Sequence, residues 1–152
     1  MAAIGASAVE QLRTGLQGSA YTPGEDGYDE GRQAFNLNAH QEPALVVIAG
    51  AAEDIVVAVK LARDQGLGVG VLATGHGVAN PCDGGVLVNT SSMRGVSVDP
   101  ASQTARVEPG ALWSDVIPEA QSHGLILGGW HRRLYAWRRL RLARAQVRVR
   151  RR

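Results

Sequence analysis

The stretch from Gly66 to Pro81 reads Gly-Leu-Gly-Val-Gly-Val-Leu-Ala-Thr-Gly-His-Gly-Val-Ala-Asn-Pro. Its apolar part predicts a buried strand from Val69 to Ala73, which runs directly into the glycine-flanked turn Thr74-Gly75-His76-Gly77. Glycine has no Cβ and tolerates positive φ, so such a turn can bring the backbone close to a neighbouring group. Successive exposed N–H groups in a turn form a concavity that suits a phosphate. The alternative is a tight turn after a strand that carries an incidental histidine.

The segment before this stretch completes a βαβ pattern. Ala44 to Ile48 is a continuous apolar run, which predicts a strand buried on both faces. Ala51 to Gln65 follows as a helix, with acidic residues in its first turn and Gly66 as its stop. Together with Leu67 to Ala73, these segments predict a compact βαβ unit. The turn then lies at the carboxyl end of the second strand, where α/β sheets usually bind ligands.

The rest of the chain predicts further short elements and an α+β fold: the βαβ unit plus a small mixed sheet with a hairpin. Pro118 predicts a kink in the last of the expected helices, or a later start at Ser114. The expected helices are Ser7 to Leu16, a turn or two within Tyr28 to Asn36, and Leu112 to His123. The expected strands are Val86 to Asn89, Val96 to Val98, Thr104 to Val107 and Leu125 to Leu127, with a loop over Tyr21 to Gly27.

Length and composition limit the classes of protein to which this chain can belong. The 152 residues fit one domain of ordinary size. Cys82 is the only cysteine, which excludes an intramolecular disulfide and agrees with a reducing compartment. The first residues lack the pattern of a signal peptide, and no apolar run is long enough to span a bilayer, so we expect a cytoplasmic protein without a membrane partner.

Charge divides the chain into an acidic body and a basic tail. Up to Gly129 there are six Lys or Arg residues and all fourteen acidic residues, whereas Trp130 to Arg152 holds ten arginines and no acid. Part of the tail, Leu134 to Ala145, could form a basic helix. Three interpretations are open: a nucleic-acid or acidic-partner arm, a solvated disordered end, or sequence foreign to the domain such as an out-of-frame translation. The abrupt change at Gly128-Gly129 favours the last two over a nucleic-acid partner.

Several phrases, in this order and spacing, resemble one family of enzymes. They are Gly27 to Arg32, Gln41 to Val47, Ala51 to Val59, Thr74 to Gly77, Asp83 to Met93 and Val98 to Ala111. The body, about Thr22 to Gly129, resembles the N-terminal part of FAD-linked oxidases with the PCMH-type (vanillyl-alcohol-oxidase-like) FAD-binding domain, close to berberine-bridge-enzyme-like bacterial oxidoreductases. The resemblance implies three parts: a lead-in over 1–40, a partial FAD-binding domain over 41–129, and a foreign tail over 130–152.

The resemblance implies FAD as the cofactor and names its contacts. In the family, backbone amides of the loop usually written Arg-x-Gly-Gly-His-Ser wrap the FAD pyrophosphate; the corresponding cofactor-binding residues here are Thr74, Gly75, His76 and Gly77, followed by Val78. Leu72, Thr74 and Gly77 depart from the family's basic residue, glycine and serine. His76 matches the histidine that carries the flavin covalently in many members; its alternative is an ordinary turn histidine.

Other matches are to residues outside this turn. Ser91, Ser92 and Met93 match a stretch on the adenine and ribose side, and Gly110 matches a glycine next to the cofactor. Cys82 reads as a small buried turn residue rather than a second flavin attachment. We assign no catalytic residue and no metal ligand.

The implied function is the FAD-binding portion of an FAD-dependent oxidoreductase, which transfers a hydride from a substrate C–H bond to the flavin and is reoxidised by oxygen. The family's second cofactor loop and substrate domain have no match here, so a small-molecule substrate is expected only for a full-length relative. The alternatives are a non-catalytic truncated or frameshifted remnant, and a binding protein that uses the basic tail.

Overall fold

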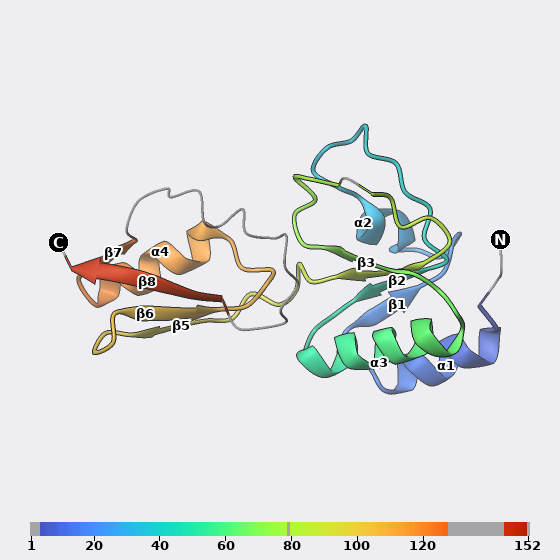
Figure 1. Cartoon of the computed structure of the whole chain (residues 1–152), viewed down its shortest axis with the longest axis horizontal. Helices are drawn as coiled ribbons and strands as arrows, with labels where there is room; N and C mark the ends of the chain where they lie inside the picture. Colours follow the sequence, from blue (N-terminus) through green and yellow to red (C-terminus); the bar gives the residue numbers. More distant parts are fainter. Residues whose placement is uncertain (1–3, 79, 128–144, 152) are drawn as a thin grey trace. The chain divides into compact units, whose positions relative to one another are not determined.

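The computed structural model of the chain describes residues 4–78, 80–127 and 145–151, which fall into two compact units, residues 1–93 and 94–152 (Figure 1). The predicted lead-in over 1–40 supplies two helices and a strand to the first unit. The predicted boundaries at residues 40 and 129 stay predictions.

The first unit is built on a four-stranded sheet in the order β1-β2-β4-β3. Its strands are β1 (Ser19–Tyr21), β2 (Leu45–Ile48), β3 (Val69–Leu72) and β4 (Val86–Asn89). β1 is antiparallel to β2, and β2 and β3 both run parallel to β4. The expected pair of parallel strands joined by a helix is confirmed, with β4 lying between the two.

Helices cover both faces of this sheet (Figure 1). α1 (Ala6–Thr14) and α3 (Ala52–Asp64) pack on the face that carries Val47, Val86 and Val88. α2 (Tyr28–Arg32) packs with Val46 and Leu87 on the other face. Because side chains alternate along a strand, the continuous apolar runs of β2 and β4 fill both cores at once.

The prediction of a buried strand is wrong for most of β3. Val69 is 43% exposed and Val71 is 51% exposed, and only Leu72 is buried. The physical reason is position: β3 is the edge strand, so an apolar run that resembled β2 in composition has no neighbour on one side. The expected loop over Tyr21 to Gly27 also needs a correction, because its first residue, Tyr21, closes strand β1.

A buried carboxylate joins three parts of the first unit. Asp54, in the first turn of α3, accepts hydrogen bonds from the backbone N–H groups of Gln17 (2.9 Å), Gly18 (2.9 Å) and Gly50 (2.8 Å). Burial alone would raise the pKa of this carboxyl, but the backbone donors together outweigh burial and hold the pKa below its usual range. The first turn of α3 is therefore tied to the turns before β1 and after β2.

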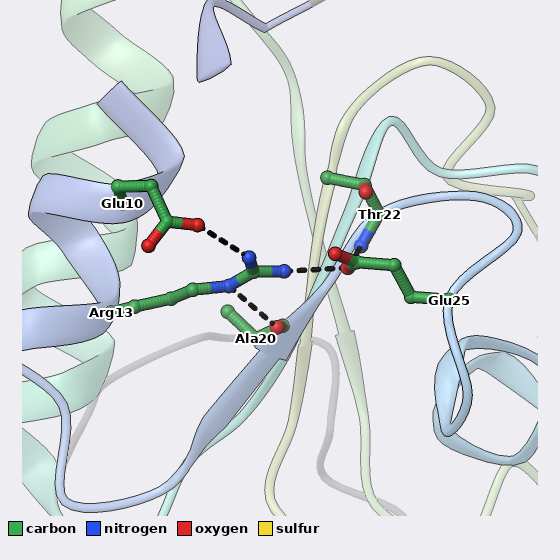
Figure 2. Close-up of polar contacts among 5 residues, drawn as sticks. All are labelled: Glu10, Arg13, Ala20, Thr22 and Glu25. Carbon is green, nitrogen blue, oxygen red and sulfur yellow. Dashed lines mark hydrogen bonds and ion pairs between the residues drawn. The ribbon is translucent and has the colours of Figure 1, made fainter. Parts of the chain in front are cut away.

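A second polar cluster lies at the surface around Arg13 of α1 (Figure 2). Its guanidinium donates to the Ala20 carbonyl at 3.1 Å, to Glu10 at 2.6 Å and to Glu25 at 2.5 Å. Glu25 also accepts the N–H of Thr22 at 2.6 Å. One planar side chain thus connects α1, β1 and the loop that follows β1.

The described residues of the second unit form an antiparallel sheet in the order β5-β6-β8-β7 and the helix α4 (Trp113–Ser122). Its strands are β5 (Val96–Asp99), β6 (Thr104–Val107), β7 (Leu125–Leu127) and β8 (Ala145–Arg151). The predicted hairpin is confirmed as β5 and β6, and Ala105, Ala120 and Leu125 form the core. The side chain of Asp115 accepts the N–H of Leu112 at 2.7 Å, so α4 begins at Trp113, before Ser114, and continues through Pro118.

Of the basic tail, the structure describes only residues 145–151. The basic helix considered for Leu134 to Ala145 lies outside the described residues, except for Ala145, which begins β8. None of the helices within the described ranges offers enough apolar length to cross a bilayer.

Candidate functional site

Two loops leave the first sheet at the carboxyl edge of neighbouring parallel strands. Leu72 of β3 pairs with Asn89 of β4, and the N–H of Thr90 donates to the Leu72 carbonyl at 2.8 Å. Residues 73–78 follow β3 as a bend and a turn, with no helix. The loop that contains Ser91 follows β4. The structure therefore brings Ser91 and residues 74–78 to the same edge of the sheet, where the βαβ pattern predicts the turn alone.

The loop over residues 74–78 carries a row of unused donors. Thr74, His76 and Gly77 are exposed, and Gly75 and Val78 are half-buried. Within the described ranges, none of the five backbone N–H groups donates a hydrogen bond to another residue. A Cβ placed on Gly77 would meet nothing within 4 Å, so the space in front of it is open. Such a row of free amides is a site for an anion.

Gly75 lets a second segment pack directly behind the loop. Its φ is +71°, and a Cβ there would lie 2.7 Å from Cα of Ala34. The N–H of Phe35 donates to the Thr74 carbonyl at 3.1 Å. The loop therefore has a backbone support from the segment after α2, and its conformation depends on a glycine at position 75.

The imidazole of His76 is held on two sides although it is exposed. Its ring stacks on the Phe35 ring with centroids 4.0 Å apart and an interplanar angle of 10°. Its Nδ1 forms a hydrogen bond of 2.8 Å with Oγ1 of Thr74. The hydrogen bond of His76 is therefore to a side chain of its own turn, and its role toward the flavin stays a prediction.

The other predicted contacts are placed differently. Ser91 is exposed, but its N–H already donates to the Asn89 side chain at 2.9 Å. Met93 is 5% exposed and packs in the core with residues of α1 and α3, and its N–H donates to the Thr90 carbonyl at 3.0 Å. Gly110 is buried within the second unit. Contacts of all three residues with the cofactor stay predictions.

Cys82 is a buried packing residue in this structure. A Cβ on Gly70 would lie 2.8 Å from its sulfur, and one on Gly85 2.9 Å, so two glycines make room for it. Burial raises the pKa of the thiol, which disfavours the reactive thiolate. This agrees with the interpretation of Cys82 as a small buried turn residue.

A hollow in the first unit lies away from the loop. It is lined by Arg13, Glu25, Tyr28 and Arg32, and by Pro43 and Ala44 just before β2. It therefore reaches the amino-terminal edge of the parallel strands, opposite to residues 74–78. The charged groups of Arg13 and Arg32 in it are already paired with neighbouring carboxylates, so the loop is the better candidate.

Sequence reasoning missed the supporting segment Ala34-Phe35. No periodicity identifies it, because it follows a helix of only five residues. The available signal was an aromatic residue in a polar stretch, and Phe35 is indeed 69% exposed.

Comparison with known proteins places this geometry in a family. A family model described as an FAD binding domain matches residues 43–132. The chain is 32% identical over 124 residues to an FAD-linked oxidoreductase of Dictyostelium discoideum, covering 81% of this chain and 27% of that protein. It is 30% identical over 113 residues to (R)-6-hydroxynicotine oxidase of Paenarthrobacter nicotinovorans, covering 72% and 24%. The chain thus spans about a quarter of the length of these curated relatives.

Solved structures agree. The chain matches 6-hydroxy-D-nicotine oxidase from Arthrobacter nicotinovorans with a TM-score of 0.68 and 28% identity, covering 76% of this chain and 26% of that one. It matches a carbohydrate oxidase from Microdochium nivale with a TM-score of 0.69 and 23% identity, over 80% and 27%, which shows the fold alone. The expected α+β fold and the resemblance to FAD-linked oxidases are confirmed. Because the family model matches more than half of its length, the chain belongs to the FAD binding domain family of FAD-linked oxidoreductases, and its cofactor is FAD.

Proposed function

We propose that the backbone N–H groups of residues 74–78 bind the diphosphate of FAD. The observation that carries this proposal is the row of donors without partners, at the carboxyl edge of β3. A diphosphate needs several donors close together, and a loop without side-chain bulk lets it approach the amides. Gly77 supplies the open approach, and Gly75 supplies the close support from Ala34.

The loop would bind an anion through the dipoles of its backbone N–H groups rather than through charged side chains. No Lys or Arg lies between Gly66 and Met93, and the body of the chain is acidic. Recognition of the diphosphate therefore rests on amide groups held in place by the fold, which need no reorganisation on binding. His76 adds the one ring in the loop that can both donate and accept.

The chemistry that FAD supplies when bound is acceptance of a hydride from a substrate C–H bond, followed by return of the electron pair to oxygen. We propose that this is the reaction of the complete oxidoreductase. The present chain contributes binding groups to that reaction. We expect it to bind FAD without oxidising alcohols, sugars or amines, and oxygen consumption with such compounds would contradict this expectation.

Titration of the purified chain with FAD tests the proposed binding. We expect a saturable signal in calorimetry and in flavin fluorescence. Gly77→Val fills the open space in front of the amides and should weaken binding about tenfold or more. Gly68→Val is the matched control, because a Cβ at Gly68 also meets nothing within 4 Å but lies before β3. Absence of binding by the unmodified chain, or equal affinity for both variants, would refute the proposal.

Covalent attachment through His76 is a separate proposal with its own test. Precipitation of the FAD-loaded protein with acid releases a flavin that is bound only by hydrogen bonds. Yellow colour that stays with the washed protein, and is absent from His76→Gln, would support attachment. Complete release from the unmodified protein would exclude it.

A further inference from the structure

The most unusual side-chain arrangement in the first unit is an exposed imidazole that is nevertheless fixed. His76 is exposed, and its partner Phe35 is 69% exposed, yet their rings are nearly parallel at 4.0 Å. Phe35 contributes to neither core of the sheet. Packing of the core therefore does not explain the position of the Phe35 ring, which lies directly against the imidazole of His76.

The hydrogen bond to Thr74 settles which ring nitrogen is available. Thr74 Oγ1 lies 2.8 Å from Nδ1 of His76. Whichever of the two atoms donates, Nδ1 is engaged by the hydroxyl. Nε2 has no hydrogen-bond partner among the residues that the structure describes. It is the nitrogen that the ring can offer to a ligand.

Two backbone contacts hold together the segments that carry the Phe35 and His76 rings. Phe35 is held to the loop by its own N–H, which donates to the carbonyl of Thr74. Gly75 packs against Ala34 with no room for a side chain. Both contacts come just before His76 in the loop, so they hold the backbone that carries its ring next to Phe35.

We propose that Thr74 and Phe35 are positioning residues, which orient His76 so that Nε2 faces the bound cofactor. The inference rests on the proposed function of the loop, because it names the part of that site which orients its histidine. Thr74 engages one nitrogen and Phe35 covers one face of the ring. Neither side chain needs to touch FAD.

The first test uses the protein without FAD. Histidine labelled with ¹⁵N gives long-range ¹H–¹⁵N signals for both ring nitrogens, and His76→Gln assigns those of His76. Thr74→Val, which removes the hydroxyl, should move the Nδ1 signal toward that of free histidine recorded under the same conditions. Thr74→Ser keeps the hydroxyl and should leave it in place. An unchanged Nδ1 signal in Thr74→Val, or the same change in Thr74→Ser, overturns the inference.

The second test adds FAD and follows the same signals. In the unmodified protein FAD should shift the Nε2 signal of His76 more than the Nδ1 signal, and the reverse order overturns the inference. Phe35→Leu should lose the ring-current shift of the His76 protons and bind FAD several-fold more weakly. Leu37→Ala removes a neighbouring side chain that is 67% exposed, and should change neither property. Equal affinity for Phe35→Leu and the unmodified protein would remove Phe35 from the proposal.

The two proposals fail in distinguishable ways. If calorimetry shows no binding of FAD, the proposed function fails. The signals recorded without FAD still decide whether Thr74 orients His76.

Discussion

The buried carboxylate of Asp54 accepts the backbone N–H of Gly18 at 2.9 Å, across 36 positions of the sequence. The same carboxylate accepts Gln17 and Gly50, so its two oxygens serve three donors. We expect Asp54→Asn to lower the free energy of unfolding by about 2–4 kcal/mol, because an amide NH₂ then faces at least one buried N–H. Urea denaturation measures the loss. Glu53→Gln changes an exposed acid in the same helical turn and should have little effect.

The pH dependence of this difference follows from the pKa of Asp54. The folded protein holds that pKa below its usual range, so the carboxylate contributes stability above the unfolded value of about 3.9 and loses it as the pH falls through the folded value. Protonated Asp54 resembles asparagine in shape, and each presents a donor where the carboxylate presents an acceptor oxygen. We therefore expect the stabilities of the unmodified protein and Asp54→Asn to converge below about pH 4. A difference that stays constant from pH 7 to pH 3 would contradict this origin.

Substitutions at two glycines with positive φ can distinguish the free-energy cost of a strained backbone from the cost of a steric contact. Gly75 has φ +71° and Gly66 has φ +66°, but only Gly75 faces a neighbour, Ala34, at 2.7 Å. Gly66→Ala should cost about 1 kcal/mol, from conformation alone. Gly75→Ala should cost more, since the loop must also move away from Ala34, and it should weaken FAD binding while Gly66→Ala does not. Thermal unfolding with and without FAD measures both effects.

The sequence predicted the parts of this fold that depend on local pattern. The helix before Gly66, the strand from Val86 to Asn89 and the hairpin around Asp99 each have a composition that decides their structure within a few residues. The exposure of Val71 could not be predicted in this way, since it depends on β3 pairing with β4 on one side and, among the residues that the structure describes, with no strand on the other.

Local sequence pattern likewise predicts only part of the candidate site. The glycine-flanked turn identified residues 74–78, because the glycines that permit close approach are themselves in the sequence. Its support by Phe35 is a contact across about forty positions, and no local pattern marks it. Met93 illustrates the converse: the sequence match predicts a cofactor contact at this position, whereas its side chain lies in the core.

Cys82 gives a test that depends on burial alone. The thiol is 9% exposed, and burial raises its pKa, so both access and thiolate fraction are low. We expect it to react with Ellman's reagent at least about a hundred-fold more slowly in the native protein than in guanidinium chloride. Rapid reaction of the native protein at pH 8 would show that Cys82 is accessible. The loop residue Thr74 changed to cysteine should react rapidly and serves as the exposed reference.

The Arg13 cluster tests whether geometry or charge holds α1 to the strand beside it (Figure 2). Arg13 uses its fork for three acceptors, Ala20, Glu10 and Glu25, and its hydrogen bond with Glu10 is the main reason that its pKa lies above the usual value. Lysine keeps the charge but offers no planar fork, so Arg13→Lys should lower the free energy of unfolding by about 1 kcal/mol.

A neighbouring pair supplies the control for that change. Among the described residues, the guanidinium of Arg63 is paired with Asp64 alone, and both side chains are more than half exposed, so Arg63→Lys should leave stability unchanged. High salt screens the attraction of either cation to the two carboxylates but not the hydrogen bond to the neutral Ala20 carbonyl. Because arginine and lysine carry the same charge, the Arg13→Lys loss should persist in 1 M NaCl. A loss that disappears in salt would mean that the hydrogen bond to Ala20 contributes nothing.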